Sequence, residues 1–306
     1  MKTLVTGGSG YIGTHILKHL LEQCHEVTVV TRHPEKLSRG GYGDGLTIVE
    51  ADLEDPSWYR SVLEGQDCCI YAALVWGDER REIEGYDASI TARFFEAVGQ
   101  AKVRRAIYLS STAVHRGSVG RINESAVYSS QELYGATKAA GEMFFRAACA
   151  RHAISSVVVR PGPVVGRPAF DDAAFRGPQQ VHALVEEAFT SGLLTVGQRG
   201  CFQLCDVHVL AQLLAQLTRS ESVDSTYFCV GVESLSWEGV AELIAVRTGG
   251  EIRLSLENEE RRETPYFQTD RMQAFLGRET YSTQALIEHL DYLIDKEMNR
   301  NSGVVS

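Results

Sequence analysis

The sequence predicts an α/β fold in which a doubly wound parallel β-sheet is joined by a smaller C-terminal lobe. Over about the first 160 of the 306 residues, short apolar strands alternate with amphipathic helices. This alternation is typical of a parallel sheet that is covered by helices on both faces. After Pro161, Gly and Pro interrupt the chain as far as residue 178, and the elements become shorter. We therefore expect a lobe there that is partly interleaved with the sheet.

The individual elements follow from hydrophobic periodicity and from the turn residues between them. In the first part we expect strands at 2–6, 26–31, 46–50, 67–73, 105–110 and 154–160, and helices near 11–23, 56–64, 83–100 and 128–151. In the second part we expect helices near 178–190, 207–219, 236–247 and 282–298, and strands near 193–196, 226–231, 251–254 and 265–269. Residues 1–160 would form a dinucleotide-binding unit to which segments near 200–231 return, and residues 161–306 mostly a substrate lobe.

Composition indicates an ordinary globular protein, with 44% hydrophobic and 23% charged residues. The net charge of −10 without any basic stripe argues against nucleic acid or an anionic membrane as a partner. No apolar run approaches the roughly 20 residues of a membrane span, and the first residues already belong to a strand, which leaves no room for a signal peptide. We therefore expect a cytoplasmic protein.

The seven cysteines do not indicate a metal site. They form no C-x-x-C pair, and the nine histidines do not accompany them at zinc spacing. Reduced and mostly buried thiols are the simplest interpretation. Cys201 and Cys205, four positions apart, are expected to serve packing.

A glycine-rich turn follows the first strand, where residues 6–13 read TGGSGYIG. A strand that turns sharply into a helix, with its backbone close to a pyrophosphate, needs residues without Cβ, here Gly7, Gly10 and Gly13. The helix that opens at Tyr11 and Ile12 would direct its free N–H groups and the positive end of its dipole at the phosphates. Because the turn lies between a strand and an amphipathic helix, we interpret it as the dinucleotide-binding turn of a Rossmann-type fold rather than a purely structural turn.

The residues after the second strand determine which dinucleotide binds. A chain that binds NAD usually places a carboxylate there to accept hydrogen bonds from the adenosine ribose. This chain has Thr31 followed by Arg32, and a guanidinium suits the 2′-phosphate of NADP. NADP is therefore favoured and NAD is the alternative, while a purely structural interpretation makes Arg32 a surface residue at the start of a loop.

Asp52 and Leu53 follow the third strand and are a second candidate contact for the cofactor. An acidic side chain at this place can accept a hydrogen bond from the adenine amino group. Asp52 could equally cap the helix near Pro56, although Asp55 is the better candidate for that cap.

Small residues follow the fourth strand. Ala72 and Ala73 would let a cofactor lie flat across the edge of the sheet. The next residues, Leu74, Val75 and Trp76, suit either an uncharged substrate or the protein core.

Tyr134 and Lys138 form a Y-x-x-x-K motif on a long expected helix, where the i,i+4 spacing puts phenol and ammonium on one face. An ammonium stabilises a neighbouring phenolate, which matters because an ordinary phenol, with a pKa near 10, is a poor acid or base at neutral pH. Ser111 ends the fifth strand at the carboxyl edge, where open α/β sheets bind ligands. Its hydroxyl could bind a substrate oxygen beside the tyrosine, although Ser110 or Thr112 could take this place.

The glycine turn, the serine at a strand end and the Y-x-x-x-K motif, in this order, resemble the short-chain dehydrogenase/reductase superfamily. The chain is most similar to its extended branch, the NAD(P)-dependent epimerase/dehydratase-like proteins. Further segments resemble motifs of that branch: residues 123–124 (NE), 160–166 (RPGPVVG), 227–231 (YFCVG) and 236–244 (SWEGVAELI).

The resemblance implies a role for each matching residue. Tyr134 would be the proton donor or acceptor, Lys138 would bind the ribose, and Ser111 would orient a small-molecule substrate. Pro161 would contact the cofactor. A homodimer through the helices near 83–100 and 128–151 is also implied.

Departures from the family pattern narrow the expected chemistry. Residues 111–113 read STA where the family's dehydratases carry Thr-Asp-Glu, and Pro163 stands where its sugar-nucleotide epimerases usually have Asn. His115 replaces the tyrosine of the family's V-Y-G and either reaches the pocket or lies in an uninvolved loop.

We therefore expect an NADPH-dependent carbonyl reductase or alcohol dehydrogenase acting on a small or medium organic carbonyl, similar to the dihydroflavonol-reductase-like group, in which an Arg similarly follows the second strand. The nearer alternative is an NAD-dependent sugar-nucleotide epimerase. A non-catalytic NADP-sensing regulator is a further alternative, although such relatives typically lack the Tyr–Lys pair.

Overall fold

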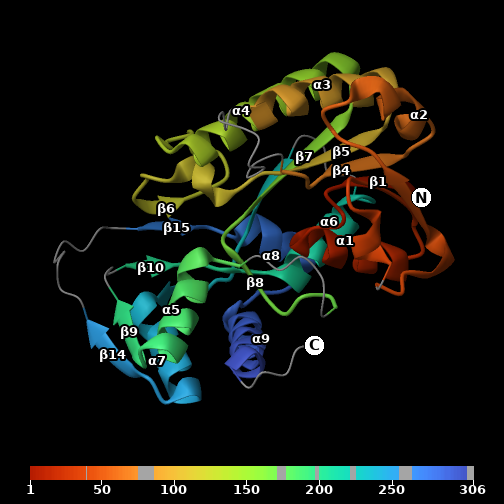
Figure 1. Ribbon diagram of the computed structural model, residues 1–306. Coiled ribbons are helices and arrows are strands. Elements are labelled where there is room, and N and C mark those ends of the chain that lie inside the picture. Colours follow the sequence, from red (N-terminus) through yellow and green to blue (C-terminus); the bar gives the residue numbers. More distant parts are fainter. Residues whose placement is uncertain are drawn as a thin grey trace.

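The centre of the computed structural model is a seven-stranded parallel sheet with the order β3-β2-β1-β4-β5-β7-β12 (Figure 1). The structure describes residues 1–38, 40–74, 86–170, 177–196, 200–220, 225–254 and 264–301. The strands of the sheet are β1 (Lys2–Thr6), β2 (Glu26–Thr31), β3 (Leu46–Glu50), β4 (Cys68–Tyr71), β5 (Arg105–Leu109), β7 (Ser155–Pro161) and β12 (Ser225–Cys229). This sheet confirms the predicted fold class.

Helices cover both faces of this sheet (Figure 1). On one face lie α2 (Tyr59–Leu63), α3 (Tyr86–Gln100) and α4 (Leu133–His152), and on the other α1 (Tyr11–Glu22), α6 (Val207–Leu217) and α8 (Asp270–Leu276). Successive side chains of a strand point to opposite faces, so that Leu4 packs in the core under α3 and Val5 in the core under α1. Because both faces are buried at the centre of the sheet, β4, β5 and β7 are almost wholly buried rather than alternating, whereas the edge strand β3 is partly exposed.

The remaining elements form a third apolar cluster beside the sheet (Figure 1). Its helices are α5 (Gln179–Thr190), α7 (Trp237–Thr248) and α9 (Thr283–Asn301), and its strands include β9 (Leu193–Val196), β10 (Cys201–Phe202), β13 (Leu235–Ser236) and β14 (Glu251–Leu254). Val185, Ile244 and Leu290 are buried where the three helices meet. The predicted helices and strands of this part therefore exist within a few residues of their expected bounds.

Several elements of two to four residues were not predicted, because such short segments show no periodicity. The strands are β6 (Gly120–Ile122), which pairs with β15 (Pro265–Phe267), and β8 (Val164–Val165), which pairs with β11 (Cys205–Asp206). The 3₁₀ turns are η1 (Pro34–Leu37), η2 (Gly43–Gly45), η3 (Pro56–Trp58) and η4 (Thr112–His115).

Helix α4 begins at Leu133 rather than near residue 128. The backbone N–H groups of Ser129 and Ser130 both donate to the carbonyl of Val114, at 3.0 and 3.2 Å. This binds the preceding segment to η4, so the chain becomes helical only after it has left that turn.

Within the described residues, none of the helices combines the length and the hydrophobicity that crossing a bilayer requires. The same part of the chain contains no group of three or more His, Cys, Asp or Glu side chains suited to a metal ion.

Candidate active site

The glycine turn between β1 and α1 is shaped by close backbone approaches. Gly7 has φ +71°, and a Cβ on it would lie 2.7 Å from Cα of Ala73. A Cβ on Gly13 would lie 2.1 Å from the carbonyl oxygen of Gly7. By contrast, the nearest atom to a Cβ on Gly10 would be 3.3 Å away. The turn is therefore packed against the end of β4, while Gly10 leaves its outer side open.

The start of α1 fits the pyrophosphate of a nicotinamide dinucleotide. Gly10 is the N-cap, no side chain caps the helix, and its first turn has no acidic residue. The backbone N–H groups of Tyr11, Ile12 and Gly13 could therefore bind a diphosphate without a competing carboxylate. The side chain of Tyr11 turns away from this place, and its hydroxyl donates to the carbonyl of Gly166 at 2.9 Å.

The end of β2 has no carboxylate for the adenosine ribose. The hydroxyl of Thr31 is buried, lies 2.7 Å from that of Ser9 in the glycine turn, and accepts from the N–H of His33 at 3.0 Å. The Arg32 side chain is 44% exposed, and its guanidinium lies 3.8 Å from the carboxylate of Asp52. Arg32 and Asp52 thus stand together at the edge where an adenosine would lie.

Asp52 does not cap the helix near Pro56. Its carboxylate accepts from the N–H of Glu54 at 3.0 Å, whereas Asp55 accepts from the N–H of Ser57 at 2.9 Å and is the cap. Of the interpretations left open by the sequence, the structure therefore excludes capping by Asp52. Its role toward adenine stays a prediction.

The other predicted cofactor contacts lie at the same carboxyl edge of the sheet. The N–H of Ala73 donates to the hydroxyl of Thr6 at 3.3 Å, and Ala72 is partly buried beside it. Leu53 is buried in the core below the turn. Pro161 ends β7 opposite Cys229. Leu74 is 39% exposed, whereas Val75 and Trp76 lie outside the described residues.

Tyr134 and Lys138 occupy the first turns of α4, which packs tightly on η4. A Cβ on Gly135 would lie 2.3 Å from the carbonyl oxygen of Ala113, so the turn that carries Tyr134 lies directly beside the one that begins at Ser111. Lys138 is 4% exposed, and its ammonium donates to the carbonyl of Leu109 at 3.2 Å. The structure thus brings the predicted tyrosine, lysine and serine to one place.

The three adjacent hydroxyls after β5 are used differently. Ser110 is buried and donates to the carboxylate of Glu142 at 2.5 Å, which directs it into the protein. Ser111 is partly buried and accepts from the N–H of Ala113 at 3.1 Å, so its own hydroxyl proton can still be donated. Thr112 is 8% exposed. These contacts favour Ser111 over Ser110 as the substrate-orienting hydroxyl.

A buried polar cluster lies beside the Tyr–Lys pair. It was not predicted from the sequence. We call it the Glu142 cluster, and it consists of Ser110, His115, Tyr128, Glu142 and Arg160. Arg160 donates to both carboxylate oxygens of Glu142, at 2.9 and 2.8 Å, and the Tyr128 hydroxyl donates at 2.9 Å. Burial alone would raise the pKa of Glu142, but these bonds and the charge of Arg160 hold it below the ordinary value. The i,i+4,i+8 spacing of Tyr134, Lys138 and Glu142 is the signal that could have revealed it.

His115 belongs to this cluster and is fully buried. Its Nε2 accepts from Arg160 at 2.9 Å, so its Nδ1 carries the proton and donates to the carbonyl of Val127 at 3.0 Å. Burial and the neighbouring guanidinium lower its pKa to about 4. His115 is thus a neutral internal residue of this cluster rather than a histidine of an uninvolved loop.

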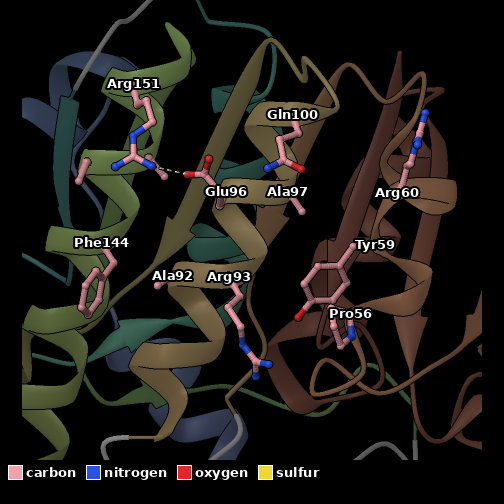
Figure 2. A pocket seen from close by; sticks show the side chains of 12 residues that line it. Pro56, Tyr59, Arg60, Ala92, Arg93, Glu96, Ala97, Gln100, Phe144 and Arg151 are labelled. Carbon is pink, nitrogen blue, oxygen red and sulfur yellow. Dashed lines mark hydrogen bonds and ion pairs between the residues drawn. The ribbon is translucent and has the colours of Figure 1, made fainter.

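A groove on the helical surface lies away from these residues. Figure 2 shows it on the outer face of α3, between α2 and α4, with a volume of about 680 Å³. Its wall includes Phe144 of α4 and the ion pair between Arg151 and Glu96 (3.1 Å). None of the predicted cofactor or catalytic residues lines it.

Comparisons with known proteins agree with this geometry. The model of the NAD dependent epimerase/dehydratase family matches residues 3–238. A UDP-glucose 4-epimerase of Streptomyces lividans is 32% identical over 191 residues, which cover 59% of this chain and 55% of that protein. A 3-beta-hydroxysteroid dehydrogenase of Mycolicibacterium neoaurum is 28% identical over 54% of this chain and 48% of that protein. The matched region spans about half the length of these relatives.

Solved structures share the fold over nearly the whole chain. The UDP-glucuronic acid 4-epimerase from Bacillus cereus in complex with NAD has a TM-score of 0.81 at 17% identity, and the similarity covers 96% of this chain and 99% of that one.

Proposed function

We propose that this chain, which belongs to the NAD dependent epimerase/dehydratase family, transfers hydride between a nicotinamide cofactor and a secondary alcohol or the corresponding ketone. Family membership confirms the resemblance stated from the motifs and the expectation of an NAD(P)-dependent enzyme of the extended short-chain dehydrogenase/reductase type. The observation that carries the proposal is the packing of α4 on η4, which brings Tyr134 and Lys138 beside Ser111.

Each of these residues has a chemical role in that step. The nicotinamide, when bound, would supply or accept the hydride. Tyr134 would give its phenolic proton to the oxygen of a carbonyl during reduction, or take it from an alcohol during oxidation. Ser111 would donate a hydrogen bond to the same oxygen, which stabilises the charge that develops there. Lys138 uses one of its three donors on Leu109, and the others would bind the ribose and favour the phenolate.

Our first candidate for the overall reaction is epimerisation of a sugar nucleotide by an enzyme that recycles its cofactor. A 4-epimerase is among the relatives with the highest identity, and the similarity to a solved 4-epimerase extends over the lobe as well as the sheet. Such an enzyme oxidises a ring alcohol and then returns the hydride to the opposite face of the ketone. Tyr134 would take the proton in the first step and return it in the second.

An NADPH-dependent carbonyl reductase is the second candidate, and Arg32 is the residue that favours it. Epimerases that retain NAD usually have a carboxylate at the end of β2, whereas this chain has the buried hydroxyl of Thr31 and the exposed guanidinium of Arg32. Pro163 likewise replaces the asparagine usual in sugar-nucleotide epimerases. A preference for NADP over NAD is part of this candidate and stays a proposal.

One experiment separates these candidates. The purified protein is incubated with UDP-glucose, and the anomeric proton signals are followed by NMR. A parallel assay follows NADPH oxidation with a panel of ketones. Formation of the 4-epimer without net cofactor consumption supports the epimerase, and steady NADPH oxidation supports the reductase. A protein that binds NADPH but performs neither reaction would fit the regulator instead.

A tyrosine variant tests the hydride-transfer step itself. Tyr134→Phe should lower turnover by at least about 10²-fold, the usual contribution of a general acid or base, and leave cofactor affinity unchanged. Tyr281→Phe is a matched control, because Tyr281 is 57% exposed and its hydroxyl bonds only to Glu279 among the contacts described. Full activity of Tyr134→Phe would contradict the mechanism.

We also propose a homodimer formed through the outer faces of α3 and α4. The apolar run 143–145 divides between core and surface: Phe145 is buried, whereas Met143 and Phe144 are 55% and 48% exposed. Phe144 lines the groove in Figure 2, so a second copy could cover it. A small-molecule substrate is supported by the relatives, and cytoplasmic location stays a prediction.

A further inference from the structure

Glu142 is in a position to neutralise the catalytic lysine, yet it does not. Lys138 and Glu142 are four residues apart on α4, the spacing at which a lysine and a glutamate on one helix normally interact. Both side chains are almost fully buried, at 4% and 0% exposure, where an ion pair would be little screened by water. Nevertheless, the Lys138 ammonium donates to the carbonyl of Leu109.

The reason lies in the number of bonds that Glu142 already accepts. A carboxylate offers about four lone-pair positions. Oε1 accepts from Ser110 at 2.5 Å and from Nε of Arg160 at 2.9 Å, and Oε2 accepts from Nη2 of Arg160 at 2.8 Å and from Tyr128 at 2.9 Å. All four positions are used, and the charge is balanced by Arg160, so nothing draws Lys138 toward Glu142.

Arg160 is itself held in this orientation from the far side. It comes from β7, and its Nη1 donates to His115 at 2.9 Å and to the carbonyl of Glu124 at 3.2 Å. The planar guanidinium therefore has fixed partners on both sides, as its fork geometry allows.

We propose that Arg160 is a positioning residue of the hydride-transfer site, which holds Glu142 and thereby leaves the Lys138 ammonium to serve Tyr134. This inference rests on the proposed role of Tyr134 and Lys138. Without Arg160, the buried carboxylate of Glu142 would have Lys138 as its neighbour one helical turn away. Lys138 would then turn toward Glu142, and the phenolate of Tyr134 would lose its stabilising charge.

Other charged or titratable groups around this site do not replace Arg160. Arg146 lies one turn beyond Glu142 on α4, but it donates to the Thr226 hydroxyl at 2.6 Å. The titratable or charged groups in contact with Lys138 or Glu142 are Tyr108 of β5, Tyr128 before α4 and Arg160 of β7, and His115 of η4 contacts Arg160. Asp87 of α3 lies behind Tyr108, and the ion pair Arg116–Glu132 before α4 is exposed.

The test measures the ionisation of Tyr134 in the free protein and needs no substrate. Tyrosines are labelled with ¹³C at Cζ, and the signal of Tyr134 is identified by its loss in Tyr134→Phe. In Arg160→Met the pH at which this phenol ionises should rise by about one unit, as expected when a unit charge at roughly 6 Å is neutralised. In Arg160→Met/Glu142→Gln it should return to the wild-type value, because no carboxylate remains to attract Lys138.

The double variant distinguishes positioning from a merely structural role. If Arg160 had only a structural role, the pH at which Tyr134 ionises would be shifted at least as far in the double variant as in the single variant. That result would overturn the proposal. If Arg160→Met does not fold, Arg160→Gln, which keeps one donor toward Glu142, is compared with the wild type and the double variant in its place. A single variant in which Tyr134 titrates as in the wild type would also overturn the proposal. Arg105→Met, at the opposite end of β5, is the matched control and should titrate like the wild type.

The result is independent of turnover. The protein could convert no substrate and still show a shift in the ionisation of Tyr134 that the double variant reverses. That outcome would support the positioning role of Arg160 and would count only against the proposed reaction.

Discussion

The buried, neutral His115 should make this protein sensitive to acid. Its pKa is lowered from 6.5 to about 4, so the unfolded chain binds a proton more readily than the folded one. Lowering the pH therefore favours unfolding, beginning as the pH falls through about 6.5 and ending below about 4. For these two values, linkage gives a loss of about 2 kcal/mol between pH 7 and pH 5 from this residue.

The variant His115→Gln removes the titration but keeps the contacts. A glutamine oxygen can accept from Arg160, and its amide N–H can donate to the carbonyl of Val127, as the two imidazole nitrogens do. Between pH 7 and pH 5, we expect the free energy of unfolding in urea to fall by about 2 kcal/mol less in the variant than in the wild type. Any absolute cost of the substitution cancels, since each protein is compared with itself.

The other buried histidines contribute equally to both proteins, so the difference isolates His115. His33→Gln is the control, because the side chain of His33 is 48% exposed and does not belong to the Glu142 cluster. Equal losses for wild type and His115→Gln would refute the assignment of His115 as a neutral residue held by Arg160.

Two further predictions concern cofactor choice and assembly. Arg32→Ala should weaken NADPH binding, measured by fluorescence titration, by roughly tenfold or more through loss of a charge-assisted hydrogen bond, with little effect on NADH; equal effects would contradict the preference for NADP. Phe144→Glu should convert the proposed homodimer to a monomer in sedimentation velocity, since it places a charge where an apolar side chain is 48% exposed, and a wild-type monomer would rule out the dimer.

The sheet could be predicted from the sequence because its signals are local. Each strand is a short apolar run, and the order of glycine turn, Ser111 and Tyr134 along the chain corresponds to neighbouring places at one sheet edge. Pairings such as that of β6 with β15 could not be predicted, since these short strands lie more than 140 residues apart and the pattern of the strand expected near 265–269 does not indicate its partner.

Reaction type was harder to predict than fold, for a related physical reason. Arg32 and Pro163 argue for a reductase, whereas one of the relatives with the highest identity is a 4-epimerase, the class that the sequence suggested only as an alternative. Both reactions use the same hydride step, so the roles proposed for Tyr134, Lys138 and Ser111 would be the same in each. The difference lies in which substrate is held and whether the cofactor leaves, and local spacing carries no such information.

The Glu142 cluster shows why a catalytic motif cannot be interpreted from its own spacing alone. Y-x-x-x-K indicates a phenol and an ammonium on one helix face, but the same rule carried one turn further places a carboxylate beside that ammonium. From the helix alone one would expect Lys138 to pair with Glu142 and to be unable to assist Tyr134. The charge that prevents this pairing is that of Arg160, which lies on a strand that follows the helix in the chain. Arg160 is held in turn by His115, which lies on a turn that precedes the helix. The chemistry of this helix therefore depends on long-range packing that its own sequence does not encode.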